Sequence, residues 1–164
     1  MFVDVWFYNS QLDHRQNWLN RLVTAVDPPF CHCEIQIPSG EAFSVYSGSK
    51  VVSRDRTFDN KYYTCVRVPC SPAQLASVTD YCNTLVNTGV TFHPLCLLAT
   101  VTGGAASYFI NTKMHTCCSR MITEALANAE IINSRVDISP SALHRLVHPL
   151  SVPCNSTSYA LDFC

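Results

Sequence analysis

The chain begins with a stretch in which apolar and polar residues alternate. Val3, Val5 and Phe7 recur at every second position, which is the period of a strand with one buried face. A tight Pro-Ser-Gly turn follows residues 30–37 and leads into a returning segment, so residues 32–46 are expected to form a hairpin. The segments with strand character are 2–8, 30–37, 41–46, 51–52 and 62–68.

Other segments carry apolar residues at every third or fourth position, which is the period of an amphipathic helix. Residues 12–26 form the first of these, with Trp18, Leu22 and Val26 four positions apart. The sequence Asp-Pro-Pro comes directly after it and is a stop signal for a helix. Two later helices are expected at 117–128 and from 139–142 onward.

The helix in the middle of the chain has the clearest boundaries. Ser71 can cap its first turn, Pro72 occupies the first helical position, and Gln74 completes a capping box. Gly89 is expected to end the helix. The sequence therefore predicts a helix between Ser71 and Gly89.

The pattern as a whole predicts a single α+β domain that spans residues 1–164. Its core is expected at about 30–147, followed by a loose tail at 149–164. Residues 95–110 are apolar but are interrupted by two glycines, which is typical of a buried helix with a loop or of a loop beside a substrate. No segment has 18 uninterrupted apolar residues, so no transmembrane segment is expected.

Length and charge narrow the class of protein. A chain of 164 residues is long enough to bury a real core in one domain. The net charge is −1, only 14% of the residues are charged, and no basic stripe is present. These features argue against nucleic acid as a partner and leave the oligomeric state open.

The cysteine content is high and has three interpretations. A disulfide-rich secreted domain is one, but a chain of this length does not need covalent staples. A zinc site is another, but the cysteines lack the spacing of structural zinc sites, so neither a metal nor a cofactor is expected. We interpret most of them as free thiols in a reducing compartment, the cytoplasm. The ten cysteines are Cys31, Cys33, Cys65, Cys70, Cys82, Cys96, Cys117, Cys118, Cys154 and Cys164.

Two adjacent cysteines lie where a helix is expected to begin. With Thr116 as the N-cap, Cys117 and Cys118 fall in the first turn, where backbone N–H groups are unpaired and the helix dipole is positive. A thiol in such a place has a lowered pKa and is a better nucleophile. The same N–H groups can hold a developing oxyanion. The alternative is that both residues simply pack as small apolar side chains.

A histidine at the start of the second strand is the candidate base for such a thiol. Side chains alternate along a strand, so His32, Glu34 and Gln36 share one face, and Gln36 is expected to face solvent. A cysteine nucleophile needs a neighbouring group that removes its proton and later protonates the leaving group. Histidine suits both steps, and a third polar group must orient its ring.

The order of these segments resembles a known family. A histidine at the start of a strand, a return strand, a capped helix and then a Cys-Ser-x-x-aliphatic helix start resemble the circularly permuted branch of the NlpC-type papain-like superfamily. That branch includes bacterial YiiX-like proteins, lecithin:retinol acyltransferase and a poxvirus protein, so the resemblance is compatible with a viral protein in the host cytoplasm. The segments that carry it are His32-Cys33-Glu34-Ile35, Ser71-Pro72-Ala73-Gln74-Leu75, Gly89-Val90-Thr91-Phe92, Cys118-Ser119-Arg120-Met121-Ile122 and Ile138-Ser139-Pro140-Ser141-Ala142-Leu143.

The resemblance implies a circularly permuted papain-like (NlpC-type) fold, with a small antiparallel sheet packed on helices, and the roles of individual residues. Cys118 is the nucleophile, because Ser119 must follow it and an aliphatic residue, Ile122, must lie four positions on. His32 is the base. The family places the orienting residue on the return strand, where this chain has Ser44, but the carboxylate of Glu34 is a stronger acceptor and is our preferred third residue.

The implied activity is that of a cysteine hydrolase that cleaves amide or peptide bonds, with a peptide or protein as substrate. The lipid branch usually carries Asn-Cys-Glu at the nucleophile where this chain has Cys-Cys-Ser. An acyl hydrolase or acyltransferase acting on a lipid acyl substrate is the alternative, and a catalytically inactive binding module is another. The other histidines that compete for the role of base are His93, His115, His144 and His148.

Overall fold

The computed structural model describes residues 1–13, 18–93, 114–133 and 138–153. The expectations for residues 95–110 and for most of the tail at 149–164 concern parts of the chain outside these ranges. Within the described residues the fold is mixed α+β, with a small antiparallel sheet and four α-helices, as the sequence predicts.

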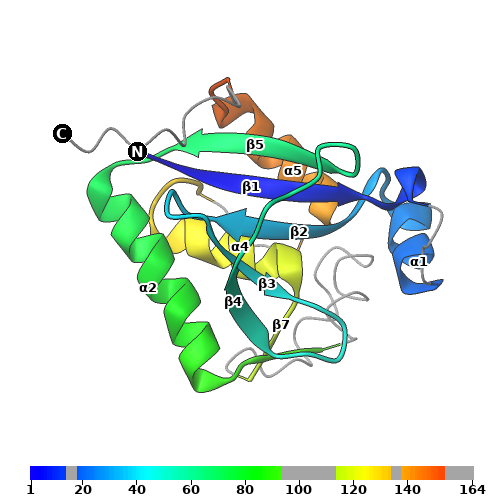
Figure 1. The fold of residues 1–164 in the computed structure, drawn as a ribbon, viewed down its shortest axis with the longest axis horizontal. Coiled ribbons are helices and arrows are strands. Elements are labelled where there is room, and N and C mark those ends of the chain that lie inside the picture. Colours follow the sequence, from blue (N-terminus) through cyan, green and yellow to red (C-terminus); the bar gives the residue numbers. More distant parts are fainter. Residues whose placement is uncertain (14–17, 94–113, 134–137, 154–164) are drawn as a thin grey trace.

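Five antiparallel strands form the central sheet, in the spatial order β4-β3-β2-β1-β5 (Figure 1). The strand β2 lies in the middle and pairs with β1 on one side and β3 on the other. Ile35 pairs with Phe43 and Gln36 with Ala42, so the expected hairpin is confirmed. The strands are β1 (Phe2–Asn9), β2 (Phe30–Gln36), β3 (Glu41–Val45), β4 (Val51–Asp55) and β5 (Tyr63–Pro69).

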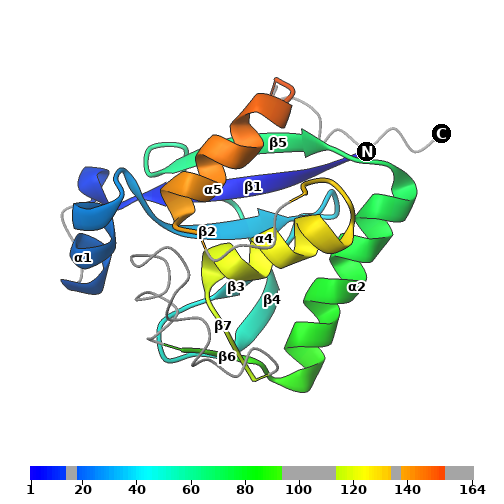
Figure 2. The same ribbon diagram turned by 180° about the vertical axis from the view of Figure 1, so that it is seen from behind.

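Two helices cover one face of this sheet. Figures 1 and 2 show α4 and α5 on the same side of β1 and β2, while α2 runs along α4 and reaches β4. The α-helices are α1 (Trp18–Val26), α2 (Pro72–Thr88), α4 (Cys118–Asn128) and α5 (Pro140–Val147). The short elements are the 3₁₀ turns η1 (Ser10–Leu12) and η3 (His148–Leu150) and the parallel pair β6 (Thr91–Phe92) and β7 (His115–Thr116).

The main core lies between the sheet and α4. The apolar positions Val3, Val5 and Phe7 of β1 are completely buried, as their alternation predicts. They belong to one cluster with Met121 and Leu126 of α4, which are also completely buried. Burial of one such side chain contributes about 1.5–3 kcal/mol to folding, so this layer fixes the helix on the sheet.

The predicted boundaries of α2 are confirmed. The Ser71 hydroxyl accepts a hydrogen bond from the backbone N–H of Gln74, and the Gln74 side chain accepts one from the Ser71 N–H. Gly89 has a φ of 68°, which is the left-handed conformation that glycine adopts most readily, and ends the helix there.

The first helix differs from the expectation. Its described part is Trp18–Val26, and residue 12, where the helix was expected to start, belongs to a 3₁₀ turn. Trp18, Leu22 and Val26 are 75%, 51% and 48% exposed, whereas Val23 is buried. The helix therefore packs toward β2 through the side that carries Val23, and its regular apolar stripe faces outward.

The prediction that Gln36 faces solvent is wrong. Its side chain is 5% exposed, accepts a hydrogen bond from the Trp6 indole (3.0 Å) and donates to the backbone oxygens of Gly40 (2.8 Å) and Arg56 (2.7 Å). The segment after β4 covers this part of the sheet, where Phe58 stacks on Trp6 at 4.5 Å between ring centroids. Both faces of β2 are therefore buried, and strand alternation alone does not distinguish such a face from a solvated one.

Candidate active site

The start of β2 is fixed by contacts with α5. Asp27 accepts hydrogen bonds from Arg145 at 3.0 and 2.9 Å, and the Ser141 hydroxyl donates to the Asp27 backbone oxygen at 2.8 Å. The same hydroxyl accepts from the backbone N–H of Phe30 at 3.0 Å. These bonds tie residues 27–30 to the helix and set the position at which β2 begins.

A β-bulge then aims the side chains at the strand entrance. Tyr8 pairs with His32 and Asn9 with Phe30, so Cys31 is an extra residue in β2. Bulges bend a strand, re-aim its side chains and are common beside active sites. Here the bulge immediately precedes His32, the candidate base.

The candidate nucleophile Cys118 is the first residue of α4. The N-cap is Cys117 and not Thr116 as expected, because Thr116 belongs to β7 and its hydroxyl donates to the Cys117 backbone oxygen. Cys118 is only 6% exposed. Its backbone N–H is one of the first-turn groups without a partner inside the helix, which suits it to hold an oxyanion.

Cys118 and His32 face the same cavity and influence each other's protonation. Both line a cavity of about 490 Å³. A hydrogen bond with Cys33 lowers the pKa of Cys118, whereas burial raises it. The charge of His32 and a hydrogen bond with His32 lower it further, so that the pKa of Cys118 is well below its ordinary value. Burial lowers the pKa of His32, but the charge of Cys118 and hydrogen bonds with Cys118 and Glu34 raise it to about 9. The arrangement favours a thiolate–imidazolium pair at neutral pH.

The neighbouring thiols do not share this position. Cys117 is 1% exposed, and its sulfur lies 3.8 Å from the oxygen of the Ser119 hydroxyl. It is not among the described residues that line the cavity. Burial and a hydrogen bond with Cys118 raise the pKa of Cys33, so Cys33 stays protonated and donates to the Cys118 sulfur. Cys31 also lines the cavity, but burial raises its pKa to about 11, so Cys118 is the thiol of the wall whose pKa is lowered.

Both candidates for the third residue lie at the same nitrogen of His32. Nε2 is 3.2 Å from the Ser44 hydroxyl and 3.6 Å from Oε1 of Glu34. The Tyr46 ring stacks on the imidazole at 4.8 Å between centroids. Nε2 is therefore directed at these two groups.

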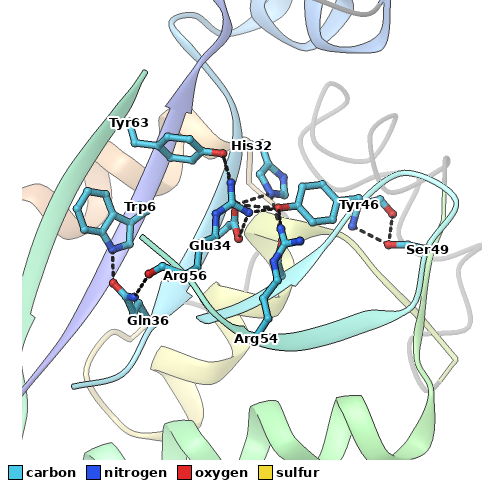
Figure 3. Close-up of polar contacts among 10 residues, drawn as sticks. Trp6, His32, Glu34, Gln36, Tyr46, Ser49, Arg54, Arg56 and Tyr63 are labelled. Atoms are coloured by element: carbon cyan, nitrogen blue, oxygen red, sulfur yellow. Dashed lines mark hydrogen bonds and ion pairs between the residues drawn. The ribbon is translucent and has the colours of Figure 1, made fainter. Parts of the chain in front are cut away.

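Glu34 is held by several donors, as Figure 3 shows. Its side chain is completely buried; Arg56 Nη1 lies 2.6 Å from Oε1 and 2.9 Å from Oε2, and the Tyr46 hydroxyl donates to Oε1 at 3.0 Å. Burial raises the pKa of Glu34, but the hydrogen bond and charge of His32 and the charge of Arg56 lower it overall. Glu34 is therefore ionised beside His32.

Sequence reasoning missed three of the residues at this site. Tyr46 shares a face with Ser44 in the hairpin, so continued alternation along the return strand would have pointed to it. Cys33 is next to His32 but on the opposite face, and only the packing of α4 brings it to Cys118. Arg56 follows β4 and carries no local signal, because its contact with Glu34 depends on the path of the chain across the sheet.

The other histidines lie elsewhere. His93 and His115 contact each other at 4.6 Å between ring centroids, beside β6 and β7. His144 and His148 are 5.2 Å apart, and His144 packs edge-on against Phe7. Among the residues that the structure describes, none of these four lines the cavity with Cys118.

Three further findings bear on the class of protein. Within the described ranges no group of three or more His, Cys, Asp or Glu side chains is arranged to hold a metal ion. Among the helices described, none is both long enough and apolar enough to cross a membrane. No protein-family model, curated protein or solved structure matches the chain.

Proposed function

We propose that this protein is a cysteine hydrolase with a circularly permuted papain-like fold. The observation that carries the proposal is the shared cavity of Cys118 and His32, in which the thiol has a lowered pKa and the imidazole a raised one. A nucleophile at a helix start, paired with a histidine whose second nitrogen contacts a polar group, is the arrangement of thiol hydrolases.

The chemistry follows from these positions. The Cys118 thiolate attacks a carbonyl carbon, and the negative charge on the carbonyl oxygen is held by the Cys118 backbone N–H. The His32 imidazolium gives its proton to the leaving group as the bond to the carbonyl carbon breaks, which leaves a thioester on Cys118. Water, deprotonated by His32, then attacks the thioester, releases the acid and restores the thiol pair.

We favour an amide or peptide bond as the reacting group of the substrate. The cavity wall contains four tyrosines and one carboxylate, which present hydrogen-bonding groups beside aromatic surface. The wall also carries apolar side chains, among them Val23, Val45 and Phe92, which a peptide side chain or an acyl chain can contact. The Cys-Cys-Ser sequence at the nucleophile, in place of Asn-Cys-Glu, is what favours the amide or peptide bond. The residues of the wall are Tyr8, Asp13, Asn20, Val23, Cys31, His32, Val45, Tyr46, Ser47, Tyr62, Tyr63, Phe92 and Cys118.

The state of the cysteines supports a reducing compartment for this activity. Within the described ranges, Cys31, Cys33, Cys70, Cys82 and Cys118 are free thiols. A thiolate nucleophile persists only where oxidation is held in check. We place the protein in the cytoplasm, which for a viral protein is that of the host.

Alkylation as a function of pH tests the proposal. Iodoacetamide should modify Cys118 rapidly well below pH 8, as read by mass spectrometry of the peptide that contains it, while the buried thiol of Cys82 reacts slowly. His32→Ala should slow the reaction at neutral pH and much less at high pH, where the thiolate forms unaided. If Cys118 reacts no faster than Cys82 at pH 7, the protein is a binding module and not a hydrolase.

A panel of fluorogenic substrates tests the class of bond. Peptide amides should be cleaved in preference to long-chain acyl esters. Faster release from the esters would instead assign the protein to the lipid acyl hydrolases and acyltransferases.

A further inference from the structure

A buried ion pair lies behind the catalytic histidine. Glu34 has no exposed surface, and the Arg56 side chain is 20% exposed. Arg56 Nη1 contacts both carboxylate oxygens, and Nη2 donates to the Tyr63 hydroxyl at 2.7 Å (Figure 3). An arginine clamped in this way has a fixed position relative to Glu34 and, through it, to His32.

The charges around His32 come from few groups. On its own strand it faces Glu34, and Cys118 approaches it from α4. From the return strand come the Ser44 hydroxyl and the Tyr46 ring. Of the other titratable groups in the cavity wall, Cys31, Tyr8 and Tyr63 have pKa values raised by burial and are neutral at pH 7. The Asp13 carboxylate accepts a hydrogen bond from the Tyr8 hydroxyl at 2.6 Å.

Four charged groups interact at His32 and Glu34, and their charges cancel. The Cys118 thiolate and the Glu34 carboxylate are negative, and the His32 imidazolium and the Arg56 guanidinium are positive. A carboxylate alone beside His32 would bind the imidazolium proton tightly and make it a poor acid. With a neutral residue in its place, the His32 imidazolium would lose its proton too readily to keep Cys118 as a thiolate. The site has both a carboxylate and a cation that offsets it.

We infer that Arg56 is a positioning residue of this site, which clamps Glu34 and offsets its charge so that His32 can both hold and release its proton. The inference rests on the proposed function, since it assigns Arg56 a part in the same proton transfers. Arg56 acts through Glu34 and is not among the described residues that line the cavity.

Opposite single substitutions test the inference. The pKa of His32 is measured by NMR titration of its ring protons in a Cys118→Ala background, so that the thiolate does not contribute, and the signal is assigned by its loss in His32→Ala. Glu34→Gln should lower the pKa of His32 by about one unit or more, because the nearest negative charge is lost. Arg56→Met should raise it by about half a unit or more, because that negative charge is no longer offset.

Two controls separate charge from structure. Arg56→Lys keeps the cation and should leave the pKa of His32 close to that of the Cys118→Ala parent. Arg54→Met is the matched arginine control, because Arg54 donates to the Tyr46 hydroxyl and makes no described contact with Glu34. It should shift the pKa of His32 by less than half as much as Arg56→Met does.

The outcomes that overturn the inference are distinct. A role of Arg56 in structure alone would loosen the site in both variants, and the pKa of His32 would move the same way in Glu34→Gln and Arg56→Met. An equal effect of Arg54→Met and Arg56→Met would contradict it as well. Because the titration is read without Cys118, these results are independent of whether Cys118 is reactive, which the alkylation experiment decides by itself.

Discussion

The two faces of the central sheet are buried in different ways. On the face toward α4, the side chains of β2 are Cys33 and Ile35, which are completely buried among apolar residues. On the opposite face, β2 presents His32 and Glu34, whose neighbours are arginine, tyrosine and serine side chains. The first face needs only matching shapes, whereas on the second every buried polar atom needs a partner.

This difference explains how one short strand can serve both stability and chemistry. The apolar face holds α4 against the sheet and so fixes the height of Cys118 above it. The polar face holds the Glu34 carboxylate, which adds to the effect of Cys118 in raising the pKa of His32. The bulge at Cys31 lies at the entrance of the strand, where the two kinds of face meet at the cavity.

The largest expected effect is on the thiol that the apolar face positions. Cys118→Ala should abolish covalent labelling at the site and any hydrolase activity with the fold retained, because little packing is lost at a helix start. Cys117→Ala should change labelling less than about twofold, since the Cys117 side chain is buried and is not among the described residues that line the cavity. The readout is intact-mass labelling with circular dichroism as the check on folding. Loss of labelling in Cys117→Ala would move the nucleophile by one residue.

A pair of substitutions compares the stabilities of the two faces. Phe43→Ala, on the apolar face, should cost about 3–5 kcal/mol of unfolding free energy because it leaves a cavity. Arg56→Met should cost about 3 kcal/mol, because it leaves the Glu34 charge buried without its main partner. Both values are measured by urea unfolding.

The double variant Glu34→Leu/Arg56→Met sharpens this comparison. Its free energy of unfolding should differ from that of the wild type by less than about 1 kcal/mol, since an apolar pair replaces a buried ion pair at little net cost. It should nevertheless lose most of the rapid labelling of Cys118. A double variant as unstable as Arg56→Met alone would show that the polar face is needed for folding.

Glu34 and Ser44, the two candidates for the residue that orients His32, can be compared directly on the polar face. Glu34→Gln should slow labelling at neutral pH about tenfold, the equivalent of one pKa unit, because an amide stabilises the imidazolium less than a carboxylate does. Ser44→Ala should slow it about twofold, although its hydroxyl lies closer to Nε2 (3.2 Å against 3.6 Å). Labelling rates at pH 7 decide the order. A larger effect of Ser44→Ala would place the orienting residue on the return strand.

The smallest effect is expected in the way the free energy of unfolding changes at acid pH. The pKa of Glu34 is lowered in the folded state, so its stabilising contribution is present above its usual pKa of about 4.5 and is lost as pH falls through the folded value. The difference in unfolding free energy between the wild type and Glu34→Gln should therefore shrink steadily below about pH 4.5. Urea unfolding at a series of acid pH values measures it. A constant difference would show that Glu34 titrates normally.

Local patterns in the sequence determined the parts of the fold that depend on neighbouring residues. The capping box at Ser71, the alternation of β1 and the hairpin after β2 follow from backbone hydrogen bonding within a few residues. The order of the segments also pointed to Cys118 and His32, which the structure brings to one cavity. The resemblance on which their roles rest is still a prediction.

Only the tertiary structure decided the surroundings of these residues. The path of the chain after β4 buries Gln36 and brings Arg56 to Glu34 across 22 positions of sequence. The orientation of α1 on β2 leaves Trp18 exposed although its spacing is that of an apolar stripe. Periodicity shows which side chains share a face. What packs against that face depends on segments distant in sequence, and their contact energies are gained only when the sheet and its helices have come together.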